Sequence, residues 1–119
     1  MHNHESLASR VREMLAELPL AVEEKTMFQG ITFMVDNKML LCVGKNDFLF
    51  RIGEDQARIE LERSPCRQMI HNGRLMKHFV FVDAADIRKD VELRYWVDLC
   101  LRFNSQAKPS KKKKGRTDT

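Results

Sequence analysis

Two glycine-containing stretches, Met27-Phe28-Gln29-Gly30 and Asn72-Gly73-Arg74-Leu75-Met76, decide the fold expected for this chain. Each places glycine beside bulky apolar residues inside a strand-like run, a pattern typical of tight turns and of closely approaching backbones. Asn-Gly is also the strongest short-range hairpin signal in a single sequence. We therefore predict a β-hairpin that turns at Asn72-Gly73. We interpret Gly30 as a bulge or a close strand crossing, with a ligand approaching bare backbone there as the alternative.

Further strand signals surround both stretches. Before the hairpin, alternation of apolar and polar residues predicts strands at 22–30, 31–35, 39–43 and 48–52. Asp36-Asn37-Lys38 joins the second and third of these, because Asp and Asn tolerate the left-handed conformation of tight turns. The hairpin itself should pair 66–70 with 79–82, and 75–78 can extend its second arm.

Three segments have helical spacing instead. The first runs from Leu7 to Pro19 and carries one apolar stripe, formed by Leu7, Val11, Met14, Leu15 and Leu18. The second covers 54–63 and should turn Ala57, Ile59 and Leu61 inward.

The third helix, expected at 87–103, should be the main core helix. Its apolar face includes Val91 and Trp96, and Asp83 and Asp86 are candidate caps at its amino end.

These elements predict a two-layer α+β domain, an antiparallel sheet with helices, in the order α-β(3-4)-α-β(2)-α. A chain of 119 residues fits one such domain, which we place at 1–103. Residues 104–119 are rich in Lys, Ser, Pro and Gly, and we expect a disordered lysine-rich tail there.

The formal charge of +4 is misleading, because it is unevenly distributed. The tail holds six basic residues and one acidic residue, so it carries +5 and the rest of the chain carries −1. The candidate nucleic-acid contacts are therefore in the tail: Lys111, Lys112, Lys113, Lys114 and Arg116. Such lysines would bind phosphates weakly and without sequence preference. The alternative is that they only keep the carboxy terminus soluble.

Cysteine usage and hydropathy indicate a cytoplasmic protein. Cys42, Cys66 and Cys100 are odd in number, widely spaced and set among apolar neighbours, as reduced thiols are. The sequence has no apolar run long enough to span a membrane and no signal-peptide pattern.

Several of these residues also carry a family resemblance. Met27-Phe28, Gly30, Asn37-Lys38-Met39 and Gly73-Arg74-x-Met76 resemble the motifs of the TfoX/Sxy competence-regulator family, in its N-terminal domain. The resemblance runs from about Leu7 to Phe103, and it departs from the family pattern at Gln29, where a first glycine is usual.

The resemblance implies a similar α+β arrangement, related to small secretion-chaperone-like domains. In the best-known family members this domain precedes a helical C-terminal domain, and the whole protein positively regulates DNA-uptake genes alongside a cyclic-AMP-responsive activator. For this chain we expect a stand-alone bacterial domain with a regulatory or interaction role.

Residue chemistry favours binding over catalysis. No nucleophile has an adjacent base, no Cys and His spacing predicts a metal site, and no motif calls for a cofactor. Arg74 is a candidate anion contact, since its planar guanidinium matches carboxylates and phosphates; the alternative is a structural pairing with Glu23 or Glu24.

Two functions follow. The first is a non-catalytic module that binds a protein, or nucleic acid, through one sheet face or edge. The second is a small-molecule or anion-binding domain, or an unrecognised enzyme, that uses Arg74 near Gly30. The oligomeric state and the partner stay open.

Overall fold

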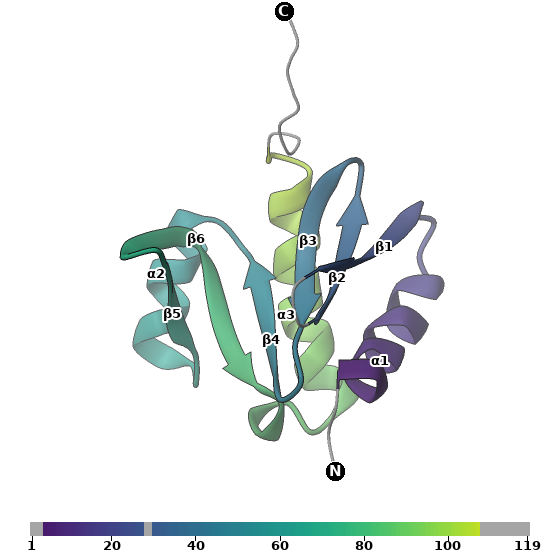
Figure 1. Ribbon diagram of the computed structural model, residues 1–119, viewed down its shortest axis with the longest axis horizontal. Helices are drawn as coiled ribbons and strands as arrows, with labels where there is room; N and C mark the ends of the chain where they lie inside the picture. Colours follow the sequence, from purple (N-terminus) through teal and green to yellow (C-terminus); the bar gives the residue numbers. More distant parts are fainter. Residues whose placement is uncertain (1–3, 28–29, 108–119) are drawn as a thin grey trace, which may run out of the picture.

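A six-stranded antiparallel sheet, covered by helices on one face, forms the domain in a computed structural model (Figure 1). The structure describes residues 4–27 and 30–107. The elements follow one another as α1 (His4–Ala16), β1 (Val22–Met27), β2 (Gly30–Val35), β3 (Lys38–Val43), β4 (Asp47–Arg51), α2 (Glu54–Arg63), β5 (Arg67–His71), β6 (Arg74–Asp83), the 3-10 turn η1 (Ala84–Asp86) and α3 (Asp90–Asn104). The α+β class and the predicted order of elements are confirmed, with four strands before α2.

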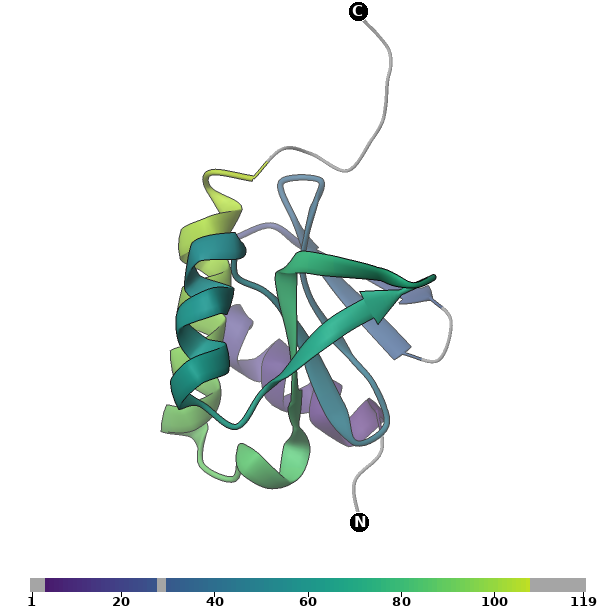
Figure 2. The ribbon, with the colours of Figure 1, turned by 90° about the vertical axis from the view of Figure 1, so that its left-hand side faces the viewer.

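The sheet order is β1-β2-β3-β4-β6-β5, and every neighbouring pair is antiparallel. Figure 2 shows the helices on one side of the sheet and the β5–β6 hairpin projecting toward the other. Helix α3 packs on β3 and β4, α1 packs on β2 and β3, and α2 packs on β6. The sheet therefore has one covered face and two free edges, β1 and β5.

Apolar residues of alternate strand positions fill the layer between sheet and helices. Phe48 and Phe50 lie opposite Val82 and Val80 of β6, and all four are fully buried. The ring of Phe50 stacks on Trp96 of α3 with 5.4 Å between ring centroids. This stack joins the sheet to the helix that the sequence predicts as the main core helix.

Both turns with predicted left-handed backbone have it. Asp36 and Asn37 have φ of 56° and 62°, and Asn72 and Gly73 have φ of 53° and 76°. Two consecutive residues with positive φ are the mark of the two-residue hairpin turns that Asn-Gly favours. The second arm of the late hairpin begins at Arg74, so 75–78 do extend it.

Several predicted boundaries are wrong by a few residues. Helix α1 ends at Ala16, and Gly30 begins β2 where we expected it to end β1. Strand β5 starts at Arg67, one residue late. These differences arise because hydrogen-bonded partners set the ends of an element, and periodicity does not reveal the partners.

The last helix differs most. It begins at Asp90, because 84–86 form a separate 3-10 turn, and Asp83 and Asp86 do not cap it. Glu92 instead accepts hydrogen bonds from the backbone N–H groups of Arg88 and Lys89, both at 2.9 Å. Val91, predicted on the apolar face, is 71% exposed.

The helix also extends past our domain boundary. Asn104 is buried; its side-chain amide donates to Val35 O at 3.3 Å, and its backbone O accepts from Lys38 Nζ at 2.8 Å. Asn104 therefore belongs to the domain, although composition places it in the tail.

In α2, Ala57 is buried as predicted, but a second inward residue is not one that we expected. Ile59 is 46% exposed, whereas Glu60 is fully buried. A carboxylate there requires partners, and α3 supplies one, as described below.

None of the helices in the described part of the chain is long and apolar enough to cross a bilayer.

Candidate interaction surface

The hairpin formed by β5 and β6 leaves the body of the sheet before its turn. Strand β4 pairs with β6 only from Phe79 to Asp83. The backbone O of His78 still accepts from Ile52 N and Gly53 N, and residues 74–77 of β6 have no described strand on that side. We call residues 69–77 the hairpin arm. It projects from the molecule away from the helices (Figure 2), and only Met69 and Met76 within it are even partly buried.

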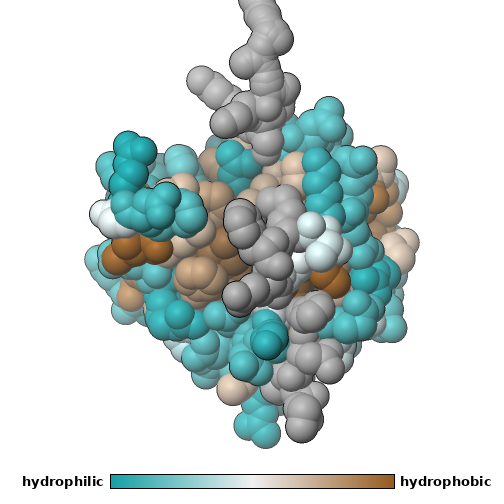
Figure 3. Space-filling view, viewed as in Figure 1, coloured by the Kyte–Doolittle hydropathy of each residue, from teal (hydrophilic) through white to brown (hydrophobic). Residues whose placement is uncertain are grey.

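Two apolar side chains are exposed on the hairpin arm. Ile70 and Leu75 face each other across the strands and are 63% and 46% exposed. They are two of the five large apolar residues exposed among those described. Figure 3 shows apolar surface over β4, β6 and the hairpin on the face opposite the helices. A contiguous apolar patch of this kind marks a binding surface more often than a random scatter does.

The hairpin arm is also basic. The chain has no acidic residue between Arg63 and Asp83, while it has Arg67, Arg74 and Lys77 in that interval. Arg67 is used within the protein: it donates to Asp83 at 2.5 Å, lies 3.4 Å from Asp47 and stacks over the Phe81 ring. The hydrogen bond to Asp83 raises the pKa of Arg67.

Arg74 occupies the first position of β6, opposite His71. It is exposed and forms no ion pair with a described residue. The predicted pairing with Glu23 or Glu24 is wrong, because β1 lies at the opposite edge of the sheet and Glu24 binds Arg12 at 2.6 Å.

Arg74 and Gly30 are also not neighbours. Strands β3 and β4 lie between β2 and β6, so the two residues sit on separate parts of the sheet. Gly30 is required for close packing of strands: a Cβ there would lie 2.2 Å from the carbonyl oxygen of Val43. The structural interpretation of Gly30 accounts for its presence without a ligand.

A groove lies between the hairpin and α2. It has a volume of about 250 Å³ and is lined mainly by apolar side chains, together with the charged residues Glu54, Arg58 and Lys77. Its lining includes Ala57, Leu61, Leu75, Met76 and Phe79, with Gln68 on the β5 side. The sequence predicts Leu61 inward but not the groove, which exists only because α2 packs against β6.

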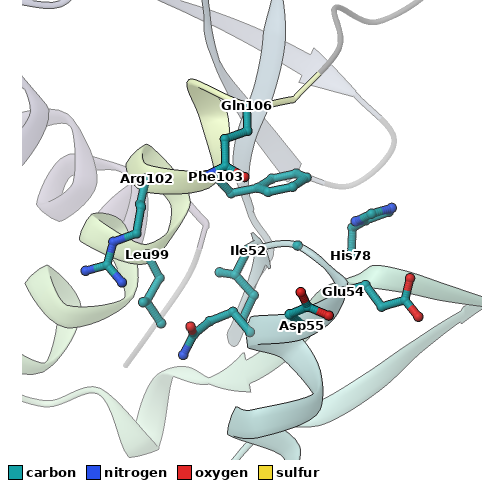
Figure 4. A pocket seen from close by; sticks show the side chains of 10 residues that line it. Ile52, Glu54, Asp55, His78, Leu99, Arg102, Phe103 and Gln106 are labelled. Carbon is teal, nitrogen blue, oxygen red and sulfur yellow. The ribbon is translucent and has the colours of Figure 1, made fainter.

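A second cavity, of about 380 Å³, lies where α2 begins and α3 ends. Figure 4 shows Glu54 and Asp55 below His78, with Phe103 and Arg102 on the α3 side. Phe103 stacks on His78 at 5.4 Å between centroids. The two carboxylates place negative charge at the helix amino end, so this cavity is a poor site for an anion.

Behind the groove, Glu60 fixes α2 to α3. Its carboxylate accepts from Tyr95 OH and Ser64 Oγ, both at 2.5 Å, from Gln56 at 2.7 Å and from Arg63 at 3.0 Å. Burial alone would raise the pKa of Glu60, but these four donors outweigh burial and lower it to about 2. The network therefore has a structural explanation, because the buried Glu60 carboxylate finds its hydrogen-bond donors within the protein.

The thiols offer no nucleophile. Burial raises the pKa of the Cys66 thiol to about 11. Burial also raises the pKa of the Cys42 and Cys100 thiols, with the larger effect on the fully buried Cys100. All three are free. A raised pKa lowers the fraction of thiolate, which is the nucleophilic form. In the described residues no group of three His, Cys, Asp or Glu side chains lies close enough to hold a metal ion.

The remaining predicted residues are placed as follows. Met27 ends β1 opposite Gly30, Gly73 makes the hairpin turn and Met76 lines the groove. Phe28 and the tail candidates Lys111 to Lys114 and Arg116 lie outside the described residues. The four buried aromatic residues Phe33, Phe48, Phe50 and Trp96 pack in the core, as their spacing predicts.

The architecture defines a small α+β domain whose distinguishing surface is an exposed hairpin beside an apolar groove. The chain belongs to the TfoX N-terminal domain family, whose family model matches residues 13–104. Neither a curated protein nor a solved structure matches the chain.

Proposed function

We propose that this chain is a non-catalytic interaction module that binds a protein partner through the hairpin arm and the neighbouring groove. The observation that carries the proposal is the exposed Ile70–Leu75 pair on an arm that projects from the sheet. Single exposed apolar side chains are common on monomers, but two that face each other on a projecting arm add to an apolar patch, and large exposed patches mark interaction sites.

The chemistry of the described residues supports a binding role. Burial raises the pKa of the Cys66 and Cys100 thiols, and the buried carboxylate of Glu60 is held by four donors within the protein. The alternative of an anion or enzyme site built from Arg74 and Gly30 loses its geometric basis, because two strands separate them. A regulatory role in the bacterial cytoplasm, linked to transcription as in the TfoX/Sxy proteins, is the setting we propose for this binding.

Site-specific photo-crosslinking in the native cell tests the proposal. A photoreactive residue at position 75 should capture a protein partner, whereas the same residue at position 91 should not. Val91 is the matched control, since it is an exposed apolar residue on α3, outside the arm. The captured protein, once purified, should bind the parent chain and bind Leu75→Ser more weakly, with Val91→Ser unaffected.

Identical products from positions 75 and 91 would contradict the proposal, as would capture of nucleic acid alone at position 75. Both serine substitutions lie at exposed positions, so the fold should survive them.

A further inference from the structure

The free edge of β5 and the groove beside it suggest how a partner is recognised. We propose that the partner contributes an extended segment with alternating acidic and apolar residues, which adds to β5 as a strand and places apolar side chains in the groove. This inference rests on the proposed function and specifies the chemistry of its partner.

Strand β5 forms one of the two sheet edges, and its pairing with β6 is irregular between Gln68 and Ile70. It pairs with β6 on one side and with no described strand on the other, so part of its backbone N–H and C=O groups lack a strand partner. The other edge, β1, carries Glu23, Glu24 and Lys25 in succession, and such charges discourage strand addition. The single charged residue of β5 other than a histidine, Arg67, is already paired with Asp83.

The groove is placed to receive side chains of an added strand. Gln68 of β5 lines it, so it reaches the free edge, and its far wall is formed by Ala57 and Leu61 of α2. Every second side chain of a strand points to the same face of the sheet. A strand added to β5 would therefore direct alternate side chains toward the helix layer and the groove.

The size of the groove favours side chains over a free ligand. Sites for small molecules usually enclose about 300–1,000 Å³. This groove encloses about 250 Å³ and is open on the side of the hairpin arm, where Leu75 is 46% exposed. It suits one or two apolar side chains of a longer chain.

The charge of the arm indicates the charge of the partner segment. Arg74 and Lys77 are exposed and form no ion pair with a described residue, and no acidic residue lies between Arg63 and Asp83. The α2 wall of the groove carries one acidic and one basic residue, Glu54 and Arg58, so the excess positive charge belongs to the arm. Opposite charges across an interface steer association and exclude wrong partners. A basic arm beside an unpaired edge therefore selects an acidic segment.

The same charges argue against a second copy of this chain at β5. An arm offers no acidic residue to Arg74 or Lys77 of another arm, so a second copy lacks the complementary charge. Nucleic acid would contact the basic side chains of the arm, but it would neither pair with the backbone of β5 nor fill the apolar groove.

Amide chemical-shift mapping tests the inference. The probe is a short peptide of alternating valine and glutamate, titrated into the isotope-labelled full chain. We expect shifts at residues 67–71 and around Leu61 and Phe79, with none in β1. A valine and lysine peptide of equal length should not bind, and neither should the valine and glutamate peptide N-methylated along one edge.

Charge reversal on the arm gives a second readout. Arg74→Glu combined with Lys77→Glu should weaken binding of the acidic peptide by about tenfold, the effect of two exposed charge contacts. Lys45→Glu is the matched control, because Lys45 is exposed in the turn between β3 and β4 and should leave binding unchanged.

Four outcomes overturn the inference. The first two are no shift at millimolar acidic peptide and shifts confined to β1. The third is a shift of the β5 amides by a short DNA duplex when the peptide gives none, and the fourth is dilution-dependent shifts at β5 without peptide, which would assign the edge to a second copy. If any of these occurs while crosslinking at position 75 still captures a protein, the proposed function stands and only the strand-addition mode fails.

Discussion

Gly30 and Gly73 are both required, but for different physical reasons. At Gly30 the space is missing, since a Cβ would meet the Val43 carbonyl oxygen at 2.2 Å. At Gly73 the space is free, with no atom within 4 Å of an added Cβ, but the backbone has φ of 76°. The sequence indicates that glycine is needed at both positions. Only the structure shows that Gly30 is required by lack of space and Gly73 by its backbone conformation.

Gly73→Val should therefore destabilise the protein through backbone strain alone. A β-branched residue at positive φ costs about 1–3 kcal/mol. Gly73→Asn is the matched control and should cost less, because Asn visits this region more readily. Chemical denaturation measures both; a Gly73→Val midpoint equal to that of the parent would mean that the turn is misassigned.

Glu60 gives the molecule a predictable response to acid. Its pKa lies near 2 in the folded protein and near 4.5 as an ordinary glutamate, so its folded pKa is depressed. A depressed carboxyl pKa contributes stability above the unfolded value, and that contribution is lost as the pH falls toward the folded value. The contribution is on the order of 2–3 kcal/mol.

The free energy of unfolding should thus decline between about pH 5 and pH 2, and Glu60→Gln should flatten this decline while lowering stability at pH 7. Glu62→Gln, at an exposed neighbour on α2, is the control and should keep the parental profile. A Glu60→Gln profile parallel to that of the parent throughout this range would show that the Glu60 network does not carry the acid response.

At the scale of elements, the start of α3 shows what periodicity can and cannot predict. Apolar spacing gives the helix and Trp96 correctly, yet the amino end is set three residues later than we predicted. The 3-10 turn at 84–86 inserts before it, and the capping is done by Glu92 from within the first turn. Acidic residues at 83, 86, 90 and 92 all suit a helix start, so only the backbone path distinguishes them.

Glu92→Ala should accordingly lower the melting temperature, because the backbone N–H groups of Arg88 and Lys89 lose their acceptor. Asp86→Ala should change it little, although the sequence makes Asp86 one of two candidate caps. Thermal unfolding of the two variants decides the matter: equal losses, or a larger loss for Asp86→Ala, would contradict the capping described for α3.

The β5–β6 hairpin also combines features that the sequence predicts with features that it does not. Asn72-Gly73 predicts the turn, and with it the facing of Ile70 and Leu75, because the register of a two-residue hairpin follows from its turn. The absence of acidic residues from 64 to 82 is also visible in the sequence. What could not be predicted is the position of α2 beside the arm, which creates the groove, and the distance of Arg74 from β1, which sheet order decides.

At the scale of the whole molecule, charge is divided between two parts of the chain. Residues 108–119 carry +5, and the remainder carries −1. We expect any DNA binding by the full chain to come from the tail and to ignore base sequence, because lysines contact phosphates.

Truncation after Ala107 keeps Asn104 and should abolish nearly all DNA binding without changing the melting temperature. For the full chain, neutralising about five phosphates predicts a slope of roughly −4 to −5 in a log–log plot of affinity against salt. Sequence-selective DNA binding retained by the truncated chain would show that the folded body carries the DNA site.

The central claim is that the hairpin arm and the edge of β5 form the surface on which a protein partner binds. Hydrogen exchange of the chain, alone and in complex with the partner captured at position 75, tests it most directly. The account predicts slower exchange in the complex at the amides of residues 68–77, with the β1 amides unchanged. Protection at β1 or along α3, with exchange in β5 and the arm equal to that of the free chain, would contradict it.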